Sequence, residues 1–364
     1  MNPTISDFNT SRKILGSLAN DEMKKIISEF HDGNIPDIAP TEFSFTMSNT
    51  TLQLANAFRR EMFCIWGWTL KVISFDPETS ENMISIIFIR NEIEKVKIPI
   101  TDTKILENLE FKIDKQNNTP KSMYVRLEDM IEVSNVLPNG LILFDPKIVV
   151  SMLKPGEIIR MRIGCEYGDP KQNIKFSQVS RVVFKYTDIK LLPENETHPR
   201  DSKSEHMSGY VIPSVQANPK SFKFNGIILV TKHENVLYNI LNETCDSLID
   251  KFKVVDELVK QYKKNKTEIF RNMFLNIIQL ETDLQEATLQ IPNECHSLGG
   301  LFCRYVSDIE PDISFVSYRL FTHENKLEIK IKHTSDISIL FVNVISKIIS
   351  DLENIKKEII LNSD

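Results

Sequence analysis

The sequence of 364 residues predicts an α+β fold in which two similar modules, each an antiparallel sheet with helices, pair within one chain. Three observations favour this fold. A strand–loop–helix pattern occurs twice without a gap, two long helices repeat one apolar stripe, and a β-rich stretch interrupts the first module. A chain of this length is expected to contain two or three folding units.

The repeated pattern begins at Phe45 and again at Leu289, 244 positions later. In each copy an alternating strand leads through a short polar link into a helix that carries an arginine. The aligned residues are Phe45, Met47, Asn49, Leu54, Ala55, Asn56, Ala57, Phe58 and Arg60 in the first copy and Leu289, Ile291, Asn293, Leu298, Gly299, Gly300, Leu301, Phe302 and Arg304 in the second. Two copies of one half-module suggest that they pair as the protomers of a dimer do.

The elements before and after the first copy are predicted in chain order. An amphipathic stretch, Met23–Phe30, is expected in an added amino-terminal arm. Leu70–Phe75 and Met83–Arg90 are rich in β-branched and aromatic residues and flank Asp76-Pro77, which predicts a hairpin.

Turn signals then separate short β-like runs, Leu141–Phe144 and Ile158–Ile163 among them, which predicts a small β-rich insert. Val179–Tyr186 resumes as a strand, and the polar, proline-bearing stretch Leu192–Lys220 is expected to be a surface excursion.

Two long helices close the modules. Leu241 in one and Ile345 in the other, 104 positions later, belong to matching stripes with spacings of three and four, and such stripes require a partner helix. The residues predicted to form the seam between the modules are Leu241, Leu248, Val255, Ile345, Leu352 and Ile359. The expected boundaries are 1–40 for the arm, 41–103 and 179–264 for the first module, 104–178 for the insert and 265–364 for the second module.

Composition narrows the classes of function. The net charge is −6 and the basic residues are scattered, which argues against a dedicated nucleic-acid binder and favours protein partners. No apolar run is long enough to cross a bilayer and no signal-peptide core is present, so an intracellular protein is expected. The five cysteines are expected to be buried thiols.

No catalytic motif is recognisable: the sequence lacks a phosphate-binding glycine loop, a nucleophile elbow and the aspartate-rich loop of a two-metal polymerase site. We therefore predict no catalytic, cofactor-binding or metal-binding residues. Cys295 and His296 are adjacent and allow a catalytic or metal pair, but their place before a helix favours a structural role, with Ser297 as the capping residue.

Several segments resemble the α-like assembly subunits of multisubunit DNA-directed RNA polymerases. Leu54–Arg60 resembles the hallmark helix of the bacterial α subunit and of the third subunit of RNA polymerase II, and Leu153–Glu157 with Phe176-Ser177 and Val183–Tyr186 resembles a later part of that subunit. The first module is thus similar to the third subunit.

The second module is similar to the eleventh subunit. His296–Leu301 resembles its His-Thr-Leu-Gly-Asn-Leu motif, with Gly300 in place of the asparagine, and Pro311–Tyr318 followed by His323 resembles a strand of that subunit. Fusion of the two partners resembles the arrangement in large nucleocytoplasmic DNA viruses of the African swine fever type. The cysteines that bind metal or iron–sulfur clusters in some relatives have no counterpart in this chain.

The resemblance implies that Arg59, Arg60 and Arg304 bind a partner subunit through bidentate contacts; the alternative is a solvated charge above an apolar stem. Trp66 and Trp68 fit either the core or an interface. Lys263, Lys264 and Lys266 fit either a solvated helix end or a nucleic-acid contact.

The leading hypothesis is a non-catalytic assembly subunit of a viral-type RNA polymerase. Its partners would be the two largest subunits and small assembly subunits, with little contact to nucleic acid and none to a membrane. It would act in viral factories of the host cytoplasm and in the virion, or in the nucleus if it is not viral. A stand-alone dimerisation module unrelated to transcription and a nucleic-acid-binding regulator remain alternatives.

Overall fold

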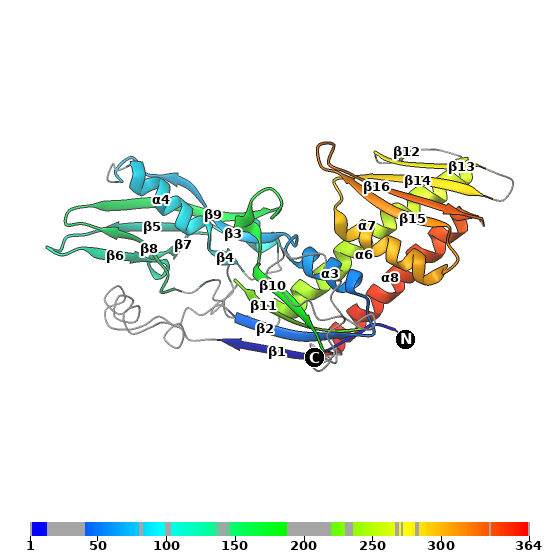
Figure 1. Cartoon of the computed structure of the whole chain (residues 1–364). Coiled ribbons are helices and arrows are strands. Elements are labelled where there is room, and N and C mark those ends of the chain that lie inside the picture. Colours follow the sequence, from blue (N-terminus) through cyan, green and yellow to red (C-terminus); the bar gives the residue numbers. More distant parts are fainter. Residues whose placement is uncertain are drawn as a thin grey trace, which may run out of the picture.

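The computed structural model describes residues 2–12, 41–79, 83–98, 103–134, 137, 144, 146–187, 220–229, 236–265, 269–270, 272–280, 284–334 and 336–362. Helices and antiparallel strands form two lobes, which lie to the right and left of Figure 1. Each lobe has its own cluster of buried residues. The α+β prediction is therefore confirmed.

The larger lobe contains a four-stranded antiparallel sheet in the order β1-β2-β11-β10. Its strands are β1 (Thr4–Arg12), β2 (Thr41–Ser48), β10 (Val179–Tyr186) and β11 (Ser221–Ile228). Alternation places Phe43, Phe45 and Met47 of β2 on the buried face. Phe45 pairs with Phe224, and the two rings stack with their centroids 4.6 Å apart.

Strand β1 differs from the expected arm. It pairs with β2 and buries Ile5, so the start of residues 1–40 belongs to this sheet. The sequence hid the strand because Ile5 and Phe8 are its only large apolar residues, and because a bulge between Ser6 and Asn9 breaks their alternation. The predicted amphipathic stretch Met23–Phe30 lies outside the described residues.

A five-stranded antiparallel sheet lies on the other side of the same lobe, in the order β12-β13-β14-β16-β15. Its strands are β12 (Ile269–Phe270), β13 (Met273–Gln279), β14 (Gln285–Pro292), β15 (Phe315–Phe321) and β16 (Lys326–His333). The central strand pair buries Leu289 against Ile329.

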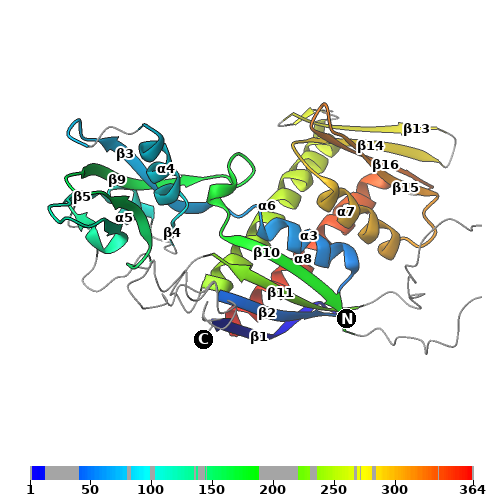
Figure 2. The same ribbon diagram turned by 60° about the vertical axis from the view of Figure 1, so that its left-hand side comes forward.

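Four helices lie between these two sheets (Figures 1 and 2). They are α3 (Leu52–Met62), α6 (Val236–Asn265), α7 (His296–Ile309) and α8 (Ile337–Leu361). Helix α6 packs along α8, and α3 packs against α7. In addition, α8 contacts β1 of the four-stranded sheet while α6 contacts β13 of the five-stranded sheet. Both sheets and all four helices therefore contribute to one core.

The second lobe has a five-stranded sheet in the order β4-β3-β9-β5-β7 and a two-stranded sheet of β6 and β8. Its elements are β3 (Gly67–Phe75), α4 (Met83–Glu94), β4 (Lys97–Ile98), α5 (Thr103–Glu107), β5 (Phe111–Gln116), β6 (Met123–Arg126), β7 (Ile131–Glu132), β8 (Val149–Leu153) and β9 (Ile158–Gly168). Its sheet begins at Gly67, so this unit starts earlier than the expected insert boundary at residue 104.

The predicted hairpin is wrong in its second half. Leu70–Phe75 lies in β3, but Met83–Arg90 lies in helix α4. Ile89 and Ile93, four residues apart, are buried in the core of this lobe, and helical spacing is what brings both onto it. Tertiary packing has overridden the local β-propensity of the isoleucines. The expected strand Ile158–Ile163 lies within β9, whereas residues 141–143 and 192–219 lie outside the described residues.

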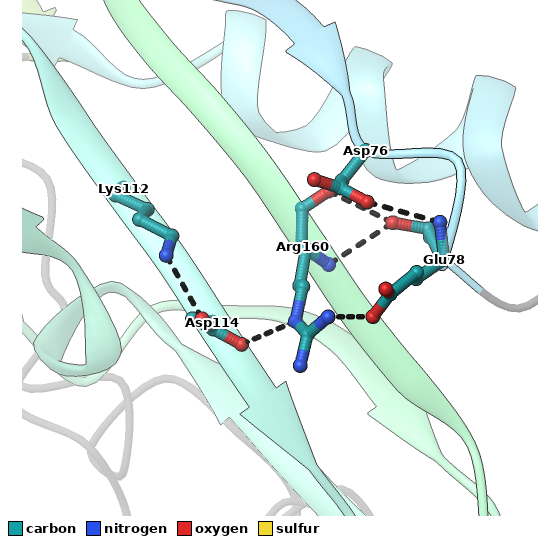
Figure 3. A network of polar contacts seen from close by, with 6 residues as sticks. Asp76, Glu78, Lys112, Asp114 and Arg160 are labelled. Atoms are coloured by element: carbon teal, nitrogen blue, oxygen red, sulfur yellow. Dashed lines mark hydrogen bonds and ion pairs between the residues drawn. The ribbon is translucent and has the colours of Figure 1, made fainter.

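A polar network closes the end of β3 on the surface of this lobe (Figure 3). The hydroxyl of Thr79 donates to the carbonyl of Arg160 at 2.8 Å and accepts from its N–H at 3.0 Å. The Arg160 guanidinium donates to Asp114 at 2.7 Å and also binds Glu78. Thr79 thus supplies bonds to β9 where β3 has ended, and the charged side chains cover the turn.

Two glycines and one aromatic ring connect the lobes. Gly67 of β3 pairs with Gly168 of β9, and a Cβ at Gly168 would lie 2.3 Å from the Phe176 ring. Phe176 is buried at this point, immediately before β10 returns the chain to the larger lobe. Glycine is required here because the ring occupies the space of a side chain.

None of the described helices is both long and apolar enough to span a membrane.

Candidate assembly interface

The two sequence copies correspond to β2–α3 and β14–α7. Asn49 and Asn293, which align in the sequence, both follow their strands with positive φ, 55° and 58°. Asparagine tolerates this left-handed conformation better than other non-glycine residues. The same residue type therefore makes the same bend at equivalent positions of the two copies.

The two helices begin differently. Thr51 caps α3, since its Oγ1 accepts a hydrogen bond from the Leu54 N–H at 3.2 Å. Cys295 occupies the N-cap position of α7 without a side-chain capping bond. Ser297 lies inside the helix, is buried, and has its Oγ 3.4 Å from the Cys295 Sγ. The prediction of Ser297 as the cap is wrong because the helix begins earlier than expected.

Close packing explains the residues at the start of α7. The His296 ring meets Tyr318 edge-on, with the centroids 5.8 Å apart. A Cβ at Gly299 would lie 2.7 Å from Tyr318 Cδ2 and 2.9 Å from Leu327 Cδ1, whereas a Cβ at Gly300 would have no neighbour closer than 3.7 Å. Gly299 therefore lets α7 approach β15 and β16.

Within the described ranges, no group of three or more His, Cys, Asp or Glu could hold a metal ion.

The three predicted partner-binding arginines have different surroundings. Arg59 donates to Asn56 Oδ1 on its own helix through Nε at 3.3 Å and Nη2 at 3.0 Å, and burial together with the neighbouring Arg60 lowers its pKa. Arg60 is half-buried and forms no ion pair with any described residue.

Arg304 forms a bidentate ion pair with Asp308 one turn later, at 3.0 and 2.9 Å. Of the three guanidinium groups, that of Arg60 retains the most donors for a partner. Arg304 is already engaged.

The six predicted seam residues all lie in the core of the larger lobe. Each is at most 2% exposed. An exposed ion pair also joins α6 and α8, the two helices that carry these residues: Lys356 Nζ lies 2.6 and 2.7 Å from the Asp246 carboxylate oxygens.

A buried charged cluster joins α3, α6 and the link that precedes α7. Lys251 Nζ lies 2.8 Å from Glu61 Oε2 and 3.7 Å from Glu294 Oε1. The Ser247 hydroxyl donates to the other Glu61 oxygen at 2.6 Å. The Glu61 side chain is only 5% exposed, so the ion pair is shielded from solvent.

Burial and pairing oppose each other in this cluster. Burial alone would lower the pKa of Lys251, but Glu61 and Glu294 outweigh it and raise that pKa. Burial raises the pKa of Glu294, and the nearby Lys251 and Lys171 only partly oppose the increase. Lys251 thus interacts with two carboxylates, those of Glu61 and Glu294.

Sequence reasoning missed this cluster, although a signal was present. Glu61 lies three and seven residues after Phe58 and Leu54 on the apolar stripe of α3, and Lys251 lies three residues after Leu248 on the stripe of α6. Charged residues within apolar stripes are expected to be buried and paired.

The two tryptophans and the lysines at the end of α6 have different degrees of exposure. Trp68 is buried, but Trp66 is 45% exposed and lies beside Tyr167, with the ring centroids 5.3 Å apart. Lys263 and Lys264 are exposed at the end of α6, and Lys266 lies outside the described residues.

Only Cys245 is fully buried; the other four cysteines are half-buried, which corrects the prediction of five buried thiols. Burial raises the pKa of both Cys165 and Cys303 to about 12. These two thiols stay protonated at neutral pH.

Comparison with known proteins gives a consistent set of relatives. No protein-family model matches the chain. It is similar to the DNA-directed RNA polymerase RPB3-11 homologs of African swine fever virus. The proteins of isolates from a South African tick, a Namibian warthog and a Kenyan pig are each 23% identical to this chain over 281 residues. The aligned part covers 75% of this chain and 73% of each relative. The similarity thus extends over three quarters of the chain and is not confined to one motif.

Proposed function

We propose that this chain is a subunit of a multisubunit DNA-directed RNA polymerase, in which a third-subunit-like and an eleventh-subunit-like module pair to form one assembly platform. Its similarity over 281 residues to proteins named RNA polymerase RPB3-11 homologs supports this proposal. As such a subunit, the chain would take part in viral transcription in infected cells. The subunit contributes no catalytic residue of its own.

The observation that carries the proposal is that each of the two long helices contacts the sheet of the other module. Helix α6 follows the four-stranded sheet yet contacts β13 of the other sheet, while α8 follows the five-stranded sheet and contacts β1. Equivalent elements pair with each other, α3 with α7 and α6 with α8. This is the arrangement expected of two partner subunits that share one core.

Joining the partners in one chain has a physical advantage. A covalent link replaces a bimolecular encounter with an intramolecular one at high effective concentration. The platform then forms without a separate partner and is ready for the two largest subunits. Small assembly subunits complete the set of proposed partners.

The two faces of the platform are unequal. Helix α3 presents Arg60 without an ion pair among the described residues, whereas the equivalent Arg304 of α7 is held by Asp308. We assign Arg60 as the main anchor for a large subunit, because a guanidinium binds carboxylate or carbonyl groups in a bidentate manner. Arg59 supports it from the same helix.

Affinity purification of the tagged full chain from its native source tests this function. The proposal predicts stoichiometric recovery of the two largest polymerase subunits, identified by mass spectrometry. Recovery of the chain without either of them would reject it and would favour a dimerisation module outside transcription. Steeply salt-dependent DNA binding by the isolated chain would favour a nucleic-acid-binding regulator instead.

A further inference from the structure

Strand β15 forms one edge of the five-stranded sheet in the larger lobe. It pairs with β16 over its whole length, from Phe315 opposite Lys332 to Phe321 opposite Lys326, without a register shift. In the part of the chain that the structure describes, no backbone hydrogen bond reaches its other side. Half of its N–H and C=O groups therefore point outward as a template for another strand.

The other edge strands in the described part of the chain are shorter than β15 or irregularly paired. Strands β4, β7 and β12 have two residues each. The pairings of β1, of β10 and of the two-stranded sheet β6–β8 contain register shifts, and β10 exposes Arg181 and Lys185. Short length, bulges and charges are the usual means of preventing unwanted strand pairing. Strand β15 has seven residues, no bulge and no proline.

The side chains of β15 add a specific chemistry to this edge. Phe315 is 45% exposed and Tyr318 is 36% exposed. The Arg319 guanidinium lies over the Phe321 ring, 4.7 Å from its centroid, and forms no ion pair with a described residue. Glu328 lies opposite Arg319, but it accepts from Gln290 at 2.7 Å. A strand added to this edge would thus meet aromatic surface around one cation.

We propose that β15 binds an extended strand of a partner protein, with apolar side chains facing Phe315 and Phe321 and a carboxylate facing Arg319. Main-chain hydrogen bonds would give affinity and the alternating side chains specificity. A second copy of β15 fits less well because the strand contains no carboxylate for Arg319. The inference rests on the proposed function in one respect: the strand is supplied by another polymerase subunit.

Hydrogen exchange of the full chain, alone and in the complex purified from its native source, tests this site. In the complex, the outward amides of β15 should exchange at least ten-fold more slowly, while those of the bulged edge β10 should be unchanged. Arg319→Glu should reduce recovery of one subunit at least ten-fold. Its matched control, Arg181→Glu on β10, should leave recovery unchanged.

The outcomes separate the two proposals. Large polymerase subunits that co-purify while β15 stays unprotected would reject the strand site alone. Protection of β15 by a protein outside the polymerase, with neither large subunit recovered, would reject the proposed function and retain a strand site. Protection in the isolated chain together with a dimeric mass would mean that a second copy occupies the edge, which overturns the inference.

Discussion

At Gly299 a single hydrogen atom decides how closely α7 approaches its sheet. Gly299→Ala should lower the free energy of unfolding by about 1–3 kcal/mol, because the methyl group would overlap Tyr318 and Leu327. Gly300→Ala is the matched control: it has ordinary contacts and should be neutral or stabilising by up to about 1 kcal/mol. Urea unfolding measures both, and equal effects would contradict this packing.

Arg60 is the residue on which partner binding is expected to depend. Arg60→Ala should reduce recovery of a large subunit roughly ten-fold, since charged hydrogen bonds contribute about 1.5–3 kcal/mol. Arg60→Lys should restore it only in part, because lysine keeps the charge without the planar fork. Arg304→Ala should have the smaller effect. Pull-down with an unchanged melting temperature is the readout, and full recovery with Arg60→Ala would exclude this anchor.

Glu294 should make stability depend on pH. Burial raises its pKa above the ordinary value of 4.5, so the folded chain keeps a proton that the unfolded chain releases. The free energy of unfolding therefore falls as pH rises from about 4.5 through the folded pKa. Glu294→Gln should gain stability relative to the parent over this range, whereas Glu353→Gln, at an exposed position of α8, should not. Urea midpoints at several pH values test this, and parallel pH profiles would contradict it.

Among the elements, the pair α6 and α8 is expected to contribute most to the shared core. Leu248→Ala and Leu352→Ala should each cost about 2–5 kcal/mol through the cavity that they leave. Ile360→Ala on α8 removes a side chain that is 45% exposed and should have little effect. Thermal and urea unfolding of the full chain give the comparison. Unchanged stability in both leucine variants would mean that these side chains do not pack in the core.

The elements that the sequence predicted are those with unambiguous periodicity. Strands β2 and β14 alternate because one face is buried, and α6 and α8 have stripes spaced by three and four over many turns. The sequence predicts a strand in place of helix α4 because isoleucine and phenylalanine favour strands locally, and only the packing of this segment shows that it is a helix. The sequence does not indicate strand β1 because this strand has few apolar residues. The pairing of Glu61 with Lys251 is likewise not visible in the sequence, because the two positions are 190 residues apart.

At the scale of the whole molecule, the sequence predicts a β-rich insert at residues 104–178, whereas the core of the smaller lobe begins earlier in the chain. The sequence changes character near residue 104, yet the core of the smaller lobe already includes Trp68, Leu70 and Val72. The reason is that β3 pairs with β9, which follows much later in the chain. Such non-local pairing leaves no local signal in composition. The repeat at 244 positions, by contrast, needed no knowledge of contacts.

The central claim is that one chain contains both halves of a paired platform. Sedimentation equilibrium of the isolated full chain tests it most directly. If the halves pair internally through α3, α6, α7 and α8, the protein should be a monomer across the micromolar range. An obligate homodimer would contradict the account, because the equivalent helices would then pair between chains.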